Sequence, residues 1–117
     1  MVRVLITVTP RMYRQAIALT IRRQRPGCDV RIAAPEDTEG ELVAFRPHLL
    51  VHNDTDGLEP ETVTRVLCRV TVLYSDGMDA QISLSGEVSE TRDMSSEDLL
   101  RIVDMASALA GGAKGPG

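Results

Sequence analysis

The first two-thirds of the chain alternates short apolar runs with segments of helical periodicity, and this alternation constrains the fold more than any other feature. The apolar, β-branched runs cover residues 2–8, 29–34, 49–52 and 70–74. Helices are expected between them at residues 10–24, at residues 39–45 and from Glu59 onward. Short connections between such elements favour parallel strands with right-handed crossovers and helices on both faces. The pattern predicts one α/β domain, a three-layer α/β/α sandwich with a mostly parallel central sheet.

The expected helices carry start signals and apolar stripes. Thr9-Pro10 predicts an N-cap residue followed by a proline in the first turn. Thr38 with Glu41 matches a capping box. Ser95 or Ser96 is expected to cap the last helix. The predicted buried stripe of the first helix is Tyr13, Ile17 and Ile21, with Ala16 and Thr20 beside them. That of the last helix is Leu99, Ile102, Val103, Ala106 and either Leu109 or Ala110.

The alternation breaks after residue 74. Asp76-Gly77 between apolar runs is a hairpin signal, and a parallel return would need a crossover of about a dozen residues. Residues 81–85 are therefore predicted to form an antiparallel hairpin arm, and the weakly apolar residues 88–92 an edge strand. The domain is expected to span residues 1–110, followed by a flexible Gly-rich tail at 111–117.

Composition narrows the classes of function. The chain has 13 Lys and Arg against 17 Asp and Glu, a net charge of −4, which argues against a nucleic-acid surface. Arg22, Arg23 and Arg25 lie at a predicted helix C-terminus, where cations complement the helix dipole. Cys28 and Cys68 form no metal motif and are expected to be small buried hydrophobes. Because neither a signal peptide nor a membrane span is visible, we expect a soluble, cytoplasmic protein.

Most of the chain resembles a response-regulator receiver domain, the flavodoxin-like signalling fold. The matching segments are residues 3–6 in the first strand, 46–53 leading through the third, 70–75 in the fourth and 96–100 at the start of the final helix. The resemblance implies a receiver-like sandwich in which a short β-hairpin or loop replaces the fourth helix. That helix belongs to the usual signalling face of receivers, so the replacement also alters the surface on which partners would dock.

The resemblance also locates a phosphorylation pocket, and the residues in it depart from the family pattern. Receivers use two acids after the first strand to hold Mg²⁺ and a third acid after the third strand to accept the phosphoryl group. Val8 and Thr9 stand where the acid pair would be, and Asn53 stands at the acceptor position. Asparagine has no anionic oxygen and cannot become an acyl phosphate. The resemblance therefore implies a degenerate, pseudo-receiver pocket.

Two further positions belong to this degenerate pocket. Ser75 matches the hydroxyl residue that ends the fourth strand of receivers. The counterpart of the receiver lysine is either Ser85 or Arg92, and Arg92 is favoured because it lies a few residues before the last helix. Asp54 follows Asn53, but alternation along a strand points its side chain away, so it is not expected to replace the missing acceptor.

Other chemistry is weakly indicated. Asp54, Asp56, Asp76 and Asp79 are predicted in loops at the carboxyl edge of the sheet, where ligands bind in open α/β folds. They are weak candidates for a divalent-metal site, because aspartate also favours turns through its own hydrogen bonds.

His48 and His52 are expected to be partly buried strand residues without a nucleophile partner. No glycine-rich phosphate loop follows the first strand, since Thr9-Pro10-Arg11 occupies that place.

These observations lead to two hypotheses. The first is a non-catalytic, receiver-like signalling or protein-interaction module, not an enzyme and without a cofactor. It would bind a protein partner or itself, as a homodimer through an exposed sheet edge or the last helix, and would bind neither nucleic acid nor membrane. The alternative is a small ligand-binding or divalent-metal-binding α/β protein that uses the aspartate-rich loops.

Overall fold

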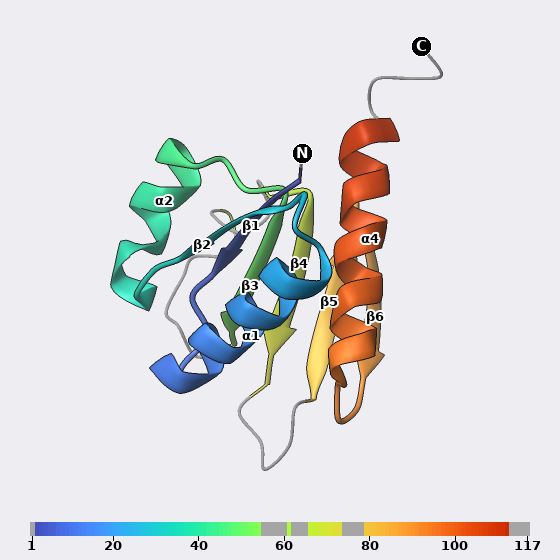
Figure 1. Ribbon diagram of the computed structural model, residues 1–117, viewed down its shortest axis with the longest axis horizontal. Helices are drawn as coiled ribbons and strands as arrows, with labels where there is room; N and C mark the ends of the chain where they lie inside the picture. The colour runs from blue at the N-terminus through green and yellow to red at the C-terminus, as the bar shows by residue number, and fades with distance from the viewer. Residues whose placement is uncertain (1, 55–60, 62–65, 74–78, 113–117) are drawn as a thin grey trace.

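The chain forms one six-stranded sheet with helices packed against it (Figure 1). The computed structural model describes residues 2–54, 61, 66–73 and 79–112. The helix expected from Glu59 falls almost entirely outside these residues. None of the helices in the described part of the chain combines the length and the apolarity needed to cross a membrane.

The sheet is mixed, which corrects the expected mostly parallel arrangement. Its strands are β1 (Arg3–Ile6), β2 (Asp29–Ile32), β3 (Leu49–Asn53), β4 (Cys68–Val72), β5 (Ala80–Leu84) and β6 (Glu87–Thr91), in the order β2-β1-β3-β4-β5-β6. The pairs β1–β2, β1–β3 and β3–β4 are parallel, whereas β4–β5 and β5–β6 are antiparallel. The physical reason is chain length, because residues 73–79 are too few for a parallel crossover.

The antiparallel arm and the edge strand were both predicted correctly. β5 pairs antiparallel with β4, and β6 lies at the edge of the sheet. Ser85 and Gly86 join the two strands with φ angles of 53° and 94°. Positive φ at both central residues is characteristic of a type I′ turn, which suits the twist of a two-residue hairpin. Glycine accepts this conformation without the strain that a Cβ would add.

The helices pack against the sheet. Figure 1 shows α1 (Arg11–Gln24) and α4 (Ser96–Gly112) together in front of the strands. A 3₁₀ helix (Pro35–Asp37) leads into α2 (Thr38–Ala44), whose Leu42 packs against a second, smaller apolar cluster. α4 extends through Gly112, so the helix runs past residue 110, where the tail was expected to begin.

Two apolar clusters join the helices to the sheet. There are two because successive side chains of a strand point to opposite faces. The larger cluster lies under α1 and α4 and includes Val4, Ile6, Val8, Ile17, Ala18, Ile21, Val51, Val70, Leu99, Ile102, Val103 and Ala106. The smaller one contains Leu5, Phe45, Leu50 and Val66, with Ala33 and Leu42 against it. The predicted stripe of α4 is therefore confirmed from Leu99 to Ala106, but not at its end, because Leu109 is 38% exposed and Ala110 is only partly buried. In α1 the stripe is shifted, because Ala18 is buried whereas Ala16 is exposed and Tyr13 is 48% exposed.

Two of the three predicted helix caps are wrong. Pro10, not Thr9, occupies the N-cap position of α1, and no side chain caps that helix. Thr38 is the first residue of α2, and its hydroxyl donates to the Pro35 carbonyl at 2.7 Å. Glu41 instead forms an ion pair with Arg31 at 3.0 Å. The Thr9 and Thr38 hydroxyls therefore donate to carbonyl oxygens, those of the Asn53 side chain and of Pro35, and neither caps a helix N–H as the local motifs predicted.

The predicted cap of the last helix is confirmed at Ser95. The Asp98 N–H donates to the Ser95 hydroxyl oxygen at 3.1 Å, and the Ser95 N–H donates to the Asp98 carboxylate at 3.0 Å. These reciprocal bonds lower the pKa of Asp98, because they favour its charged form.

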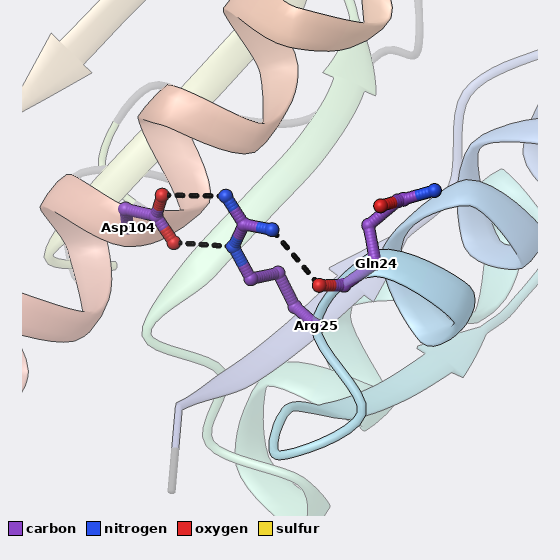
Figure 2. Close-up of polar contacts among 3 residues, drawn as sticks. All are labelled: Gln24, Arg25 and Asp104. Atoms are coloured by element: carbon purple, nitrogen blue, oxygen red, sulfur yellow. Dashed lines mark hydrogen bonds and ion pairs between the residues drawn. The ribbon is translucent and has the colours of Figure 1, made fainter.

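An ion pair joins the end of α1 to the middle of α4 (Figure 2). The Arg25 guanidinium donates from Nε and Nη2 to the two carboxylate oxygens of Asp104, at 2.7 and 2.8 Å. Its Nη1 donates to the Gln24 carbonyl at 2.8 Å. The bidentate pairing lowers the pKa of Asp104 and raises that of Arg25.

Both cysteines are free thiols, and burial raises the pKa of each. Cys68 is fully buried and Cys28 partly so. Both pack with the larger apolar cluster, as expected for small hydrophobic residues.

Candidate functional site

The candidate site lies where β1 and β3 end side by side at the carboxyl edge of the sheet. β1 and β3 run parallel with Ile6 opposite Val51, and the Thr7 N–H continues the ladder to the Val51 carbonyl at 2.9 Å. This register carries Val8 and Thr9 past the end of β1 to the level of Asn53. Val8 is fully buried in the larger apolar cluster.

Asn53 is bound directly to Thr9. The Thr9 backbone N–H and hydroxyl both donate to the Asn53 side-chain oxygen, at 2.5 and 2.9 Å. Asn53 is only 7% exposed. A carbonyl oxygen has two lone pairs, so these two donors occupy its accepting capacity. The register thus brings Val8, Thr9 and Asn53 together, and the Asn53 side-chain oxygen accepts both Thr9 donors.

This arrangement offers little to a phosphoryl group or a hard cation. Mg²⁺ needs oxygen ligands, usually including a carboxylate, and none of these three side chains carries one. In the described part of the chain, no group of three or more His, Cys, Asp or Glu residues is placed to hold a metal ion.

The two remaining pocket positions are not brought to Asn53 by described contacts. Ser75 lies outside the described residues. Arg92 is exposed and follows β6, with β4 and β5 between it and β3. Three strand spacings amount to about 14 Å, and Ala80 of β5 occupies the position beside the end of β4. The inserted hairpin arm therefore separates Arg92 from the end of β3.

The aspartates of the second hypothesis are only partly described. Asp54 is exposed directly after β3, and its N–H donates to the Val72 carbonyl at 3.1 Å. The Asp79 carboxylate accepts the N–H of Asp93 at 2.8 Å, and Asp93 has a positive φ of 50°. Asp79 thus stabilises a turn through its side chain. Asp56 and Asp76 lie outside the described residues.

Both histidines are bound within the sheet. His48 Nδ1 accepts the Arg3 N–H at 2.9 Å, and the His48 N–H donates to the Arg3 carbonyl at 2.8 Å. Burial and the nearby Arg3 charge lower the pKa of His48. His52 is buried, and its Nε2 lies 3.0 Å from the Thr71 hydroxyl oxygen.

The sequence reasoning missed Thr7. This residue is fully buried, and its hydroxyl has no hydrogen-bond partner among the described residues. It lies one position beyond the Ile6–Val51 pair, which places it beside His52 on the face opposite α1. Its only sequence signal is a polar residue inside the apolar run 2–8.

The chain was compared with known proteins at three levels. No protein-family model, no curated protein and no solved structure matches it.

Proposed function

We propose that this protein is a receiver-like signalling or interaction module that works by protein binding and without phosphoryl transfer. The finer fold assignment is part of the proposal: a three-layer, receiver-like sandwich in which the β5–β6 hairpin replaces the fourth helix. The order β2-β1-β3-β4 supports it, because flavodoxin-like folds have the strand order 2-1-3-4-5. The antiparallel β5 departs from that order's parallel fifth strand.

One observation carries the proposed loss of chemistry: both Thr9 donors are directed at the Asn53 oxygen. A receiver pocket must keep carboxylates open to Mg²⁺ and to the phosphoryl donor. Here the Thr9 and Asn53 atoms at those positions are uncharged and bond to each other, and the apolar Val8 beside them is buried. We infer that this end of the domain has a constant state that is not switched by phosphorylation.

The binding role is supported by the edge strand β6. Residues 87–90 are exposed, and Val88 is 60% exposed. In a hairpin that closes with Leu84 opposite Glu87, the backbone groups of Val88 and Glu90 point away from β5. An edge of this kind can pair with a strand from a partner. Glu87 and Glu90 would limit indiscriminate pairing through their charge.

The phosphorylation part is tested by titrating the protein with Mg²⁺ and beryllofluoride and recording amide shifts by NMR. We expect no saturable shifts at Val8, Thr9 or Asn53. The control variant Asn53→Asp restores a phosphoryl-accepting carboxylate without the acid pair that holds Mg²⁺, and it should also show no saturable shifts. Saturable shifts at these residues in the natural sequence would refute the proposal.

The binding part is tested at Val88. Proline at this position removes an outward N–H without breaking a bond to β5, whereas Val88→Thr keeps that N–H. Sedimentation at several concentrations measures self-association, and affinity capture compares the partners of the two variants. We expect association to be lost in Val88→Pro and kept in Val88→Thr. Equal association of both variants would exclude the β6 edge as the binding surface.

A further inference from the structure

A second feature of the carboxyl edge lies away from Asn53, between the start of α1 and the end of β2. A pocket of about 370 Å³ opens there. Its lining residues are Arg11, Arg14, Gln15, Ile32, Ala33 and Ala34. This volume is within the range of about 300–1,000 Å³ that is usual for small-molecule sites. Ligands of open α/β sheets bind at this edge.

The charges at the start of α1 lack a counter-charge within the helix. Arg11 and Arg14 occupy its first turn, which contains no acidic residue, and no side chain caps the helix. The dipole makes this end of a helix positive, so cations there are unfavourable and anions favourable. No acidic side chain lines the described part of the pocket. The first turn of α1 is therefore complementary to an anion.

The Arg14 guanidinium is held in place by a contact independent of the helix end. Its Nη1 donates to the Ala33 carbonyl at 2.7 Å, across the pocket from α1 to the end of β2. Its Nε is buried and has no hydrogen-bond partner among the described residues. A guanidinium fixed in this way loses little further freedom on binding, and its donors match the oxygens of carboxylates and phosphates.

The wall opposite the arginines restricts which ligands fit the pocket. Ile32, Ala33 and Ala34 present small apolar surface beside the arginines. The adjoining hollow, which shares Ile32 and Ala33, is lined by Glu36, Asp37 and Glu41, and by Arg31, which is paired with Glu41. Those carboxylates would repel a second negative group. A single phosphate on a small uncharged body matches both walls better than a polyphosphate does.

We propose that this pocket, the phosphate pocket (Arg11, Arg14, Gln15 and residues 32–34), binds a small phosphomonoester through Arg11 and Arg14. The phosphate lies against the first turn of α1, and the organic body rests on the apolar wall. The site is independent of the degenerate pocket at Asn53, so it can exist whether or not the proposed function holds.

The test is an NMR titration of the intact chain with inorganic phosphate and, separately, with ribose 5-phosphate. We expect saturable amide shifts at Arg11, Arg14, Gln15 and residues 32–34. If the organic body contributes, ribose 5-phosphate binds more tightly than phosphate. Equal affinities would show that the site takes the free anion, against the proposed phosphomonoester.

Variants distinguish a specific phosphate site from nonspecific electrostatic attraction of the anion to the protein. Arg14→Gln should weaken binding about tenfold or more, because it removes a charge-assisted contact. Arg11→Gln provides a second variant that leaves the Arg14–Ala33 bond intact. The matched control is Arg23→Gln, which removes the same charge from the exposed far end of α1. Equal weakening by Arg23→Gln, no weakening by Arg11→Gln, or no saturable shift at millimolar phosphate would each overturn the proposal.

Discussion

The contact between Thr9 and Asn53 should be a measurable part of the stability of the domain. Asn53→Ala removes the acceptor of two hydrogen bonds at a position that is 7% exposed. At about 0.5–1.5 kcal/mol for each bond, the loss is about 1–3 kcal/mol. Thr9→Val keeps the side-chain shape and removes only the hydroxyl donor, so it should cost about 0.5–1.5 kcal/mol. Because both variants remove the hydroxyl bond, their effects should not add.

Urea unfolding of the two single variants and the double variant measures this directly. A loss of about 2 kcal/mol lowers the unfolding midpoint by roughly 1 M at a slope of about 2 kcal/mol per M. The double variant should be about as stable as Asn53→Ala alone. Thr20→Val is the matched control, because the Thr20 hydroxyl donates to the Ala16 carbonyl one turn away in the same helix. Additivity within about 0.3–0.5 kcal/mol would refute the coupling.

Three further predictions follow from single contacts. Asp104→Asn should lower the melting temperature at neutral pH. Since pairing holds the folded-state pKa of Asp104 below its unfolded value, the difference should disappear as pH falls below about 4, and an unchanged difference at pH 3 would contradict this. Gly86→Ala should destabilise the protein by about 1 kcal/mol because its φ is +94°. Gly40→Ala, with open space around it, should stabilise α2 by about 0.5–1 kcal/mol. A urea midpoint raised by Gly86→Ala, or lowered by Gly40→Ala, would contradict the respective prediction. The pKa of His48 is lower in the folded state, so the unfolded chain takes up more protons and stability should fall as pH drops below about 6.5. His48→Gln should remove that part of the slope in stability measured between pH 7 and pH 5, and an identical slope would exclude His48 as its cause.

Local periodicity was enough to place most of the described elements. The apolar run around β1, the stripe of α4 and the antiparallel arm β5 follow from spacings of two to four residues and from the length of one loop. The Ser95–Asp98 cap was predictable for the same reason, because its partners are three residues apart. The sheet was predicted to be mostly parallel and is mixed, although the cause of each antiparallel pair, a short connection, was visible in the local sequence.

The candidate sites depended on contacts between distant residues. Thr9 had a local role available as the cap of α1, but its hydroxyl bonds to Asn53, 44 positions away. Arg11 and Arg14 gave no signal in the sequence, because only the packing of α1 on β2 brings Arg14 to the Ala33 carbonyl and both arginines to one pocket. Arg92 had suitable spacing along the chain, yet two strands separate its strand from β3.

The sequence by itself determined the alternation of elements, the hairpin and the absence of acids at positions 8, 9 and 53. Only the tertiary structure decided which acceptor each hydroxyl bonds and which cations converge on a pocket. The physical reason is that backbone periodicity depends on near neighbours. Side-chain hydrogen bonds and charge clusters depend instead on strand order and register, which bring distant residues together.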